Sequence, residues 1–403
     1  MRRRHRASGW ARATAMVGVL AAAFAVFPGA ASASGSSAGP PRHIFYIMME
    51  NHWYGQIIGN TRDAPFINRL AARGNLETGY YGVTHPSMPN YLAAISGSFQ
   101  GIWDDCAAGA TVTCPPEEFV PGSGDGTAGH YLTQAQIASA SATPHLFPAA
   151  NLIDQLESHH LSWRAYMQSI PSVGSQVEYA PTIQTSTGPV TVELYAQKHD
   201  PFMYFRDINH PGSARLQQIV PFAHRFAHAL RTGNVPNFVW ISPDQCHDMH
   251  GTDPASAALV GFPKCGYPNS GLDHGAIQLG DQFLRQTIGM ITSSHVWKTS
   301  NSSIIVTWDE NDYSGFKGTP TSPHGRNGVT LGGGHVALIV LNSQGGNHRT
   351  VSTFANHYNL LATIQHEWHL GCLAATCGIG PSQLLTPLFN SRHADGGRPV
   401  REM

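Results

Sequence analysis

Three apolar runs of the sequence end on acidic side chains. They read HIFYIMM, NFVWIS and SSIIVTW, and short continuous apolar runs of this kind are typical of buried strands. The polar residues that follow them are Glu50 with Asn51, Asp244 with Asp248, and Asp309 with Glu310. Carboxylates that lie close together repel one another unless protons or a cation intervene. If the three strands end at one edge of a sheet, these residues predict a metal site there.

The residue types narrow the choice of metal. Glu50, Asn51, Asp309 and Glu310 offer hard oxygen ligands, and Asp244 and Asp248 can add to them. Three histidines could contribute nitrogen ligands, namely His250, His335 and His357. Mixed oxygen and nitrogen ligation fits zinc, manganese or iron, and calcium also fits if oxygens dominate.

The stretch THPSMPNY places Ser87 between two prolines, with a short helix expected to begin near Pro89. A serine at a helix start gains from nearby N–H groups, and an adjacent cation lowers the pKa of its hydroxyl. The same arrangement can cradle a tetrahedral anion, whose oxygens His85, Asn51 and Asn90 could contact. Phosphoryl transfer is the reaction that fits: attack by Ser87, a phosphoserine intermediate, and hydrolysis by water.

Each of these patterns also has a structural explanation. A Ser-x-Pro-Asn stretch is often a capped turn, and an Asp-Glu pair after a strand is often a solvated loop. The triplet Asp248-Met249-His250 is the least expected of these patterns in a loop with a purely structural role.

Composition sets the class of protein. The chain has 403 residues, 41% of them hydrophobic and 12% charged, and its formal net charge is -1. It can therefore build a sizeable core, and it shows no basic footprint for nucleic acid. The 23 histidines leave room for a polar site rich in metal ligands.

The N-terminus has the pattern of a secretory signal peptide. Residues 1–33 hold a basic start, an apolar run and the small-residue sequence ASA, and we expect cleavage near Ala33. No later run approaches about 20 apolar residues, so we expect no integral membrane segment after cleavage and a secreted protein. The six cysteines agree with export, and their spacing favours three local pairs, Cys106 with Cys114, Cys246 with Cys265 and Cys372 with Cys377. Six cysteines nevertheless allow 15 connectivities.

Apolar strands alternate with amphipathic helices along the rest of the chain. This pattern predicts an α/β fold with a mostly parallel central sheet and helices on both faces. Ligands of such sheets bind at the carboxyl ends of the strands. We expect one domain over residues 34–403, with residues 101–145, rich in Gly, Ala, Thr and Ser, as a long loop insertion.

Seven stretches resemble, in order, the bacterial and fungal phosphoesterase family of secreted acid phosphatases and phospholipases C, which is related to the alkaline phosphatase superfamily. They are MMENHWYGQIIGN with APFINRLAARG, THPSMPNYLAAISG, NLIDQLESHHLSWRAYM, KHDPFMYF, DMHG, SIIVTWDEND and NHYNLLATIQHEWHLG. The resemblance implies an alkaline phosphatase-like fold and a divalent metal.

The resemblance also assigns residues. Glu50 with Asn51 match the first metal-site pair of the family and Asp309 with Glu310 the second, while Ser87 matches the nucleophile. His199 matches a histidine that lines the site, and the remaining matches are Asp248, His250 and His357. Asn356 and Gln168 depart from the acidic residues that the family often has, so one or two metal ions remain open. His335 stands before a strand in LGGGHV, as a metal histidine of the superfamily would.

The resulting hypothesis is a secreted, metal-dependent acid phosphatase acting on a small phosphate ester or a lipid head group. The first alternative is a phosphodiesterase of phospholipase C type on the same residues. The second alternative, from another class, is a non-catalytic extracellular metal-binding module, which Ser87 and the full set of acids disfavour.

Overall fold

The computed structural model describes residues 39–117, 131–267 and 273–389. The described residues all belong to one compact unit. The expected signal peptide, residues 1–33, lies outside them. None of the described helices combines the length and the apolar character that crossing a membrane requires.

The central sheet has eight strands in the order β11-β2-β10-β9-β1-β8-β4-β7. Its strands are β1 (His43–Met49), β2 (Asn75–Glu77), β4 (Trp163–Met167), β7 (Ile219–Pro221), β8 (Phe238–Ser242), β9 (Ser302–Trp308), β10 (Leu338–Asn342) and β11 (Thr350–Val351). The five strands from β9 to β7 are parallel, and every residue of β1, β8 and β9 is buried. The expected mostly parallel sheet is confirmed, with β10 antiparallel to both of its neighbours.

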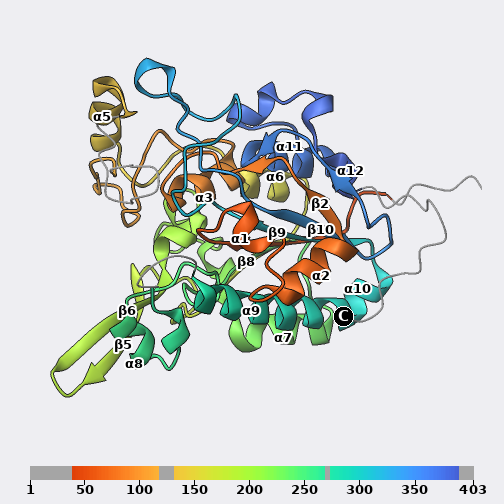
Figure 1. Ribbon diagram of the computed structural model, residues 1–403, viewed down its shortest axis with the longest axis horizontal. Coiled ribbons are helices and arrows are strands. Elements are labelled where there is room, and N and C mark those ends of the chain that lie inside the picture. Colours follow the sequence, from red (N-terminus) through yellow and green to blue (C-terminus); the bar gives the residue numbers. More distant parts are fainter. Residues whose placement is uncertain (1–38, 118–130, 268–272, 390–403) are drawn as a thin grey trace, which may run out of the picture. The chain divides into compact units, whose positions relative to one another are not determined.

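Helices cover both faces of this sheet, as the alternating pattern predicted. Figure 1 shows α3, α6 and α11 on one side and α2, α7 and α9 on the other. The α-helices are α1 (Tyr54–Ile57), α2 (Pro65–Arg73), α3 (Ser87–Ser96), α5 (Gln134–Ser141), α6 (Leu152–Ser158), α7 (Ala223–Thr232), α8 (Pro254–Leu259), α9 (His274–Ser293), α10 (His295–Thr299), α11 (His357–Glu367) and α12 (Thr386–Phe389). The 3-10 helices are η1 (Gln197–His199), η2 (Pro201–Tyr204), η3 (Leu216–Gln218), η4 (Pro263–Cys265), η5 (Arg326–Gly328), η6 (Ala374–Gly378) and η7 (Pro381–Gln383).

Two features lie outside the expected pattern. A hairpin of β5 (Tyr179–Thr185) and β6 (Gly188–Ala196) projects from the molecule at the lower left of Figure 1, and it leads directly into η1. A small pair of strands, β3 (Tyr80–Tyr81) and β12 (Ala355–Asn356), joins the segment before α3 to the start of α11. The hairpin thus directly precedes the segment that ends at His199, and the small strand pair directly precedes His357.

The three local cysteine pairs favoured by the sequence are all disulfides, and no cysteine is free. The first pair lies in the expected insertion, residues 101–145. The described part of this insertion also contains α5, whose N-cap Thr133 accepts a hydrogen bond from the backbone N–H of Gln136. It is therefore partly helical rather than a plain loop.

Candidate active site

The parallel pairing of β1 with β9 places the acidic residues side by side. Met49 stands opposite Trp308 at the ends of these strands, so Glu50 and Asp309 leave the sheet at the same level. The backbone N–H of Asp309 donates to the carbonyl of Met49 at 3.0 Å. Glu50, Asp309 and Glu310 are all at most 1% exposed. The edge of the sheet thus gathers three buried carboxylates, as the sequence predicted.

Ser87 lies between two of these carboxylates. Its Oγ is 2.9 Å from Oε2 of Glu50 and 3.3 Å from Oε1 of Glu310. It is the first residue of α3, which begins two residues earlier than expected and ends at Gly97 in a left-handed conformation (φ 70°). The hydroxyl therefore sits at the positive end of a ten-residue helix, with acceptors for its proton on two sides.

Asn90 holds the turn that presents Ser87. Its Oδ1 accepts the backbone N–H groups of Val83 and Thr84, and its Nδ2 donates to the carbonyl oxygens of Thr84 and Pro86. The same amide lies 3.3 Å from Oε2 of Glu310. Most of its hydrogen-bonding capacity is thus used by the backbone, so Asn90 acts chiefly by fixing the loop before α3.

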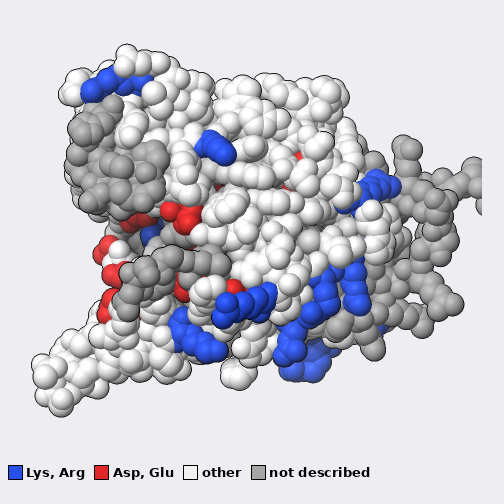
Figure 2. Space-filling view, in the orientation of Figure 1, with Lys and Arg blue, Asp and Glu red and all other residues white. Residues whose placement is uncertain are grey.

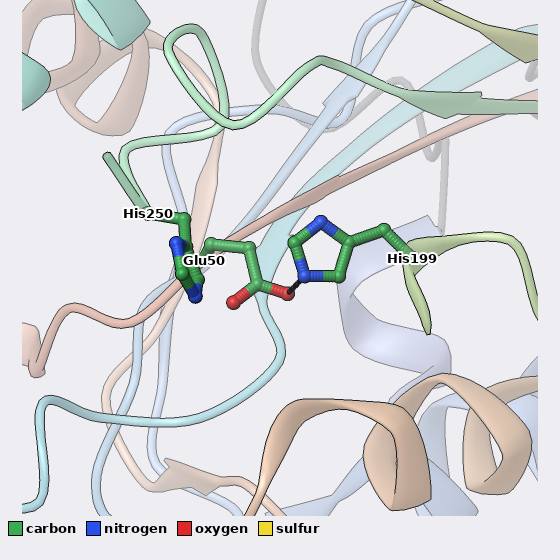
Figure 3. Close-up of side chains that lie close together, drawn as sticks. All are labelled: Glu50, His199 and His250. Atoms are coloured by element: carbon green, nitrogen blue, oxygen red, sulfur yellow. Dashed lines mark ion pairs between the residues drawn. The ribbon is translucent and has the colours of Figure 1, made fainter. Parts of the chain in front are cut away.

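Three histidines join the carboxylates. Nδ1 of His85 lies 2.7 Å from Oε2 of Glu310, while His199 bridges Oε1 of Glu50 (Nε2, 3.0 Å) and Oδ2 of Asp248 (Nδ1, 3.2 Å). His250 comes from the loop after β8, and its side chain converges on Glu50 and His199 in Figure 3. The ring of Tyr91 stacks on His199 at 5.2 Å and fixes the plane of that imidazole.

The backbone adopts unusual conformations at two of these positions. Asn51 has a φ of 51°, and its N–H donates to Oδ1 of Asp309 at 3.2 Å. Met249, between Asp248 and His250, has a φ of 88°. Asparagine tolerates this region and methionine rarely occupies it, so Met249 is a strained residue between two functional candidates.

Burial dominates the electrostatics. It raises the pKa values of Glu50, Asp309, Glu310 and Asp248 well above their usual range, and repulsion from neighbouring carboxylates raises them further. Burial also lowers the pKa of His199 well below its usual value, and it lowers the pKa values of His85 and His250 to about 3. Neutral imidazoles have a lone pair to offer a cation, and the carboxylates need protons or a cation to coexist.

The donor set fits a divalent metal ion. One ligand atom each of Glu50, His199 and His250 lies within 4.8 Å of the others. Oδ1 of Asn51 and Oδ2 of Asp309 are buried oxygens without a hydrogen-bond partner in the described part of the chain. Buried polar atoms without partners are costly, and a cation among them would satisfy them. A second group, Asp104 with Cys106 and Cys114, does not fit, because both sulfur atoms are in a disulfide.

Three predicted ligands contact other groups. Both ring nitrogens of His357 are used, by the hydroxyl of Tyr80 at 2.9 Å and by the carbonyl of Asp309 at 2.7 Å. His357 therefore stabilises the backbone at the end of β9, where Asp309 begins the loop. His335 lies between the rings of Tyr54 and Tyr81, with Nε2 2.9 Å from the carbonyl of Thr78. The geometry gives neither histidine a place in the ligand set.

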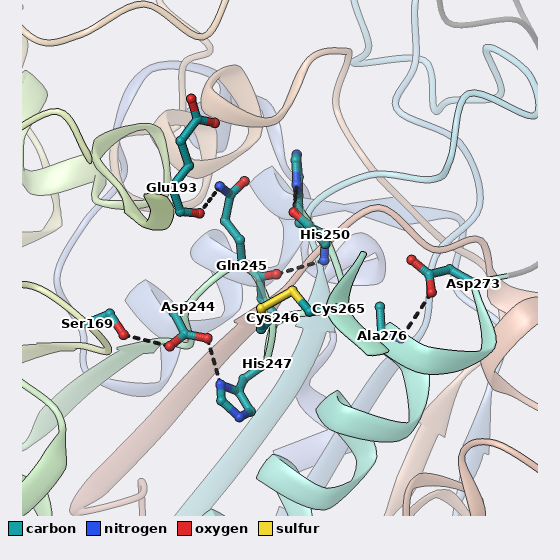
Figure 4. Close-up of a disulfide and its surroundings, with 12 residues drawn as sticks. Ser169, Glu193, Asp244, Gln245, Cys246, His247, His250, Cys265, Asp273 and Ala276 are labelled. Carbon is teal, nitrogen blue, oxygen red and sulfur yellow. Dashed lines mark hydrogen bonds and ion pairs between the residues drawn. A yellow bond between two sulfur atoms is a disulfide. The ribbon is translucent and has the colours of Figure 1, made fainter. Parts of the chain in front are cut away.

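Asp244 is the third predicted ligand that contacts other groups. Its two oxygens bind the hydroxyl of Ser169 and Nδ1 of His247, each at 2.6 Å. Figure 4 shows this group beside the Cys246–Cys265 disulfide, with the ring of His250 directed elsewhere. Gln168, noted in the sequence as a departure, joins the same group by accepting the N–H of Asp244. Asp244 thus fixes the loop after β8 instead of contributing to the site.

Sequence reasoning missed Lys198 and Asp105. Nζ of Lys198 lies 2.9 Å from Oδ2 of Asp105 and 3.3 Å from Nε2 of His250. Although burial disfavours its charge, Asp105 and Glu50 together raise its pKa well above the usual value, so it remains an ammonium ion. The signal for Lys198 was its place directly before His199 in KHDPF, whereas Asp105 stands in an insertion without periodicity.

Comparisons with known proteins identify the family of the chain. A family model described as "Phosphoesterase family" matches residues 60–371. A phosphatidylinositol-3-phosphatase from Mycobacterium tuberculosis is 29% identical over 89% of this chain and 89% of its own. A phosphate-repressible acid phosphatase from Penicillium chrysogenum is 24% identical over 77% of this chain and 56% of its own.

A solved structure of an alkaline phosphatase superfamily protein from Vibrio parahaemolyticus aligns with 13% identity and a TM-score of 0.44, covering 84% of this chain and 68% of that chain. The family match spans well over half of the sequence, including all of the residues from Ser87 to His357 discussed above. The chain belongs to the phosphoesterase family and is a phosphoric ester hydrolase.

Proposed function

We propose that this hydrolase is a secreted, metal-dependent phosphomonoesterase of acid phosphatase type that acts through a phosphoserine at Ser87. The observation that carries the proposal is the position of Oγ of Ser87, 2.9 Å from Glu50 and 3.3 Å from Glu310 at the start of α3. A serine with adjacent proton acceptors and a helix terminus is arranged as a nucleophile rather than as a cap.

The residues suggest how each step proceeds. Glu50 accepts the hydroxyl proton while Oγ forms a bond to phosphorus and the bond to the leaving alkoxide breaks, and the alkoxide takes a proton from solvent water. A second water then attacks the phosphoserine and the bond between phosphorus and Oγ breaks. Oγ takes back the proton from Glu50, and the hydroxide left in solvent takes one proton of the attacking water, so that the product is hydrogen phosphate. A divalent ion held by Glu50, Asp309, Asn51 and the neighbouring histidines would lower the pKa of the hydroxyl and neutralise charge on the phosphoryl oxygens.

Two further parts of the proposal rest on different observations. Three disulfides support export, because such bonds persist in oxidising compartments. The name of the mycobacterial relative supports a phosphoinositide as one substrate, and the name of the fungal relative supports acid phosphatase activity.

The test compares p-nitrophenyl phosphate with bis-p-nitrophenyl phosphate, using purified protein and a panel of zinc, manganese, iron and calcium. We expect preference for the monoester, and loss of at least about 10³-fold in Ser87→Ala with metal content retained. Ser293→Ala, which removes an exposed hydroxyl of α9, is the matched control. Preference for the diester would identify a phospholipase C-type phosphodiesterase instead.

Metal dependence has its own test. Exhaustive dialysis against a chelator is expected to remove both activity and bound metal, with recovery on adding one of the four ions. Full activity in protein that elemental analysis shows to be metal-free would remove the metal from the mechanism.

A further inference from the structure

Lys198 brings a positive charge into a site dominated by carboxylates. Its side chain is only 13% exposed, and its ammonium group contacts both Asp105 and His250. Nδ1 of His250 lies 2.9 Å from the carbonyl of Gly251, which assigns the proton to Nδ1 and leaves Nε2 as the acceptor facing Lys198. The lysine is therefore held between a carboxylate and an imidazole.

Asp105 connects this lysine to the nucleophile. Oδ2 of Asp105 binds Nζ of Lys198 at 2.9 Å, and Oδ1 accepts the backbone N–H of Met88, also at 2.9 Å. Met88 directly follows Ser87. One carboxylate thus fixes the ammonium group relative to the first turn of α3.

A second series of contacts links Lys198 to Glu50, the carboxylate that binds Ser87. Nε2 of His250 is 3.3 Å from Lys198, and a ligand atom of His250 lies within 4.8 Å of a carboxylate oxygen of Glu50. Glu50 in turn lies 2.9 Å from Oγ of Ser87. The contacts through Asp105 and those through His250 come from different segments of the chain, and they link Lys198 to Met88 and to Glu50, which both adjoin Ser87.

An incoming phosphate ester meets mostly negative charge here. In Figure 2, acidic side chains gather on the side from which the β5–β6 hairpin projects, while many basic side chains lie along the lower edge of the view. A phosphomonoester approaches with up to two negative charges and a phosphodiester with one. The attraction of a fixed cation grows with the charge of its partner, so a lysine in this position discriminates between the two.

We propose that Lys198 binds a phosphoryl oxygen and sets the preference for monoesters over diesters, and that Asp105 is the positioning residue that holds Lys198 against the first turn of α3. This inference rests on the proposed function. It adds a determinant of substrate charge beside the metal candidates.

The first experiment replaces the charge with an apolar chain of similar length, Lys198→Met. We expect kcat/KM for p-nitrophenyl phosphate to fall by about 10²-fold or more, and the fall for bis-p-nitrophenyl phosphate to be at least about tenfold smaller. Lys264→Met is the control, since Lys264 contacts Gln278 at the surface. Metal content and thermal midpoint are measured for each variant. An equal fall for both esters, or none, would overturn the proposal.

The second experiment tests Asp105. Asp105→Asn keeps an oxygen for the N–H of Met88 but removes the charge that faces Lys198. We expect a smaller loss than in Lys198→Met, and little further loss when the two substitutions are combined, because they act on one interaction. Fully additive losses would show that Asp105 acts independently of Lys198.

A third measurement separates this inference from the proposed function. Binding of inorganic phosphate to the metal-loaded protein is followed by calorimetry, which needs no turnover. If the wild type hydrolyses neither ester, the proposed function fails, while phosphate binding that weakens about tenfold or more in Lys198→Met still supports the anion site. Phosphate binding that is unchanged by the substitution would refute it.

Discussion

The segment from Asp244 to His250 carries two aspartates that have different surroundings. Oδ2 of Asp248 faces His199, and its carbonyl accepts the N–H of Glu50. Asp244, four residues earlier, contacts Ser169 and His247 beside the Cys246–Cys265 disulfide. Both follow the same strand, so a place at the carboxyl end of β8 brings a residue to the edge of the sheet without deciding which way it faces.

The largest effect expected from this comparison distinguishes the two aspartates directly. Asp248→Asn should lower kcat/KM for a phosphomonoester by about 10²-fold, because it removes the charge that orients His199. Asp244→Asn should change kcat/KM less than about fivefold and lower the free energy of unfolding by about 1 kcal/mol. Steady-state kinetics measure the change in kcat/KM of both variants, and urea unfolding measures the change in their free energy of unfolding. Equal kinetic losses would place Asp244 back among the site residues.

The Cys246–Cys265 disulfide offers the next test. Replacing Cys246 and Cys265 by serine opens a loop of separation 19, which should lower the free energy of unfolding by about 3 kcal/mol. Activity should fall too, because Asp248 and His250 lie in this loop. Replacing Cys372 and Cys377, at separation 5, should cost about 2 kcal/mol and leave kcat unchanged. A double serine variant at 246 and 265 with normal kcat would show that the loop needs no covalent support.

Glu77 extends the comparison to a buried carboxylate outside the site. Burial raises its pKa from 4.5 to about 7, although Gly79 donates a hydrogen bond to it. Between pH 4.5 and about 7, the folded protein therefore holds a proton on Glu77 that the unfolded chain has lost. Stability from this group is full below about pH 4.5 and is lost as the pH rises toward 7, by roughly 2–3 kcal/mol.

The Glu77→Gln variant isolates this contribution. We expect its free energy of unfolding to fall less steeply than that of the wild type between pH 4.5 and 7, as measured by urea titration at several pH values. The carboxylates of the site serve as the internal control, since they are unchanged in both proteins. Parallel curves for the two proteins would show that Glu77 titrates normally.

The smallest expected effect concerns His335. His335→Phe keeps the stack between Tyr54 and Tyr81 and removes the hydrogen bond to Thr78. The free energy of unfolding should fall by about 1 kcal/mol, with kcat and metal content unchanged. A loss of metal in this variant, found by elemental analysis, would restore the ligand role that the sequence predicted.

The sequence predicted well what depends on continuous patterns. The strands β1, β8 and β9, the helix α3 and the local disulfides all follow from apolar runs, turn residues and cysteine spacing. The direction of β10 did not, because its apolar run is equally compatible with parallel and antiparallel pairing. The β5–β6 hairpin was missed, although Val190, Val192 and Leu194 alternate with polar residues as in a half-buried strand.

For the site, the strand-end rule identified Glu50, Asp309 and Glu310, and the geometry brings them together around Ser87. It could not identify which histidines use both ring nitrogens in hydrogen bonds, as His357 does with Tyr80 and the backbone carbonyl of Asp309. Nor could it find Asp105, because only the folded chain brings that carboxylate to Lys198, 93 residues away. Roles that depend on such long-range pairs are invisible to local patterns.

The position of β1 has a consequence for how the protein is made. This first strand of the sheet pairs with residues 238–241 on one side and 302–308 on the other. A chain synthesised from its N-terminus therefore cannot pair β1 until most of its length exists, and contacts of such long sequence separation form slowly. Glu50 and Ser87 emerge early, but their partner Glu310 arrives late. The site can form only near the end of folding, so truncated chains are expected to be inactive.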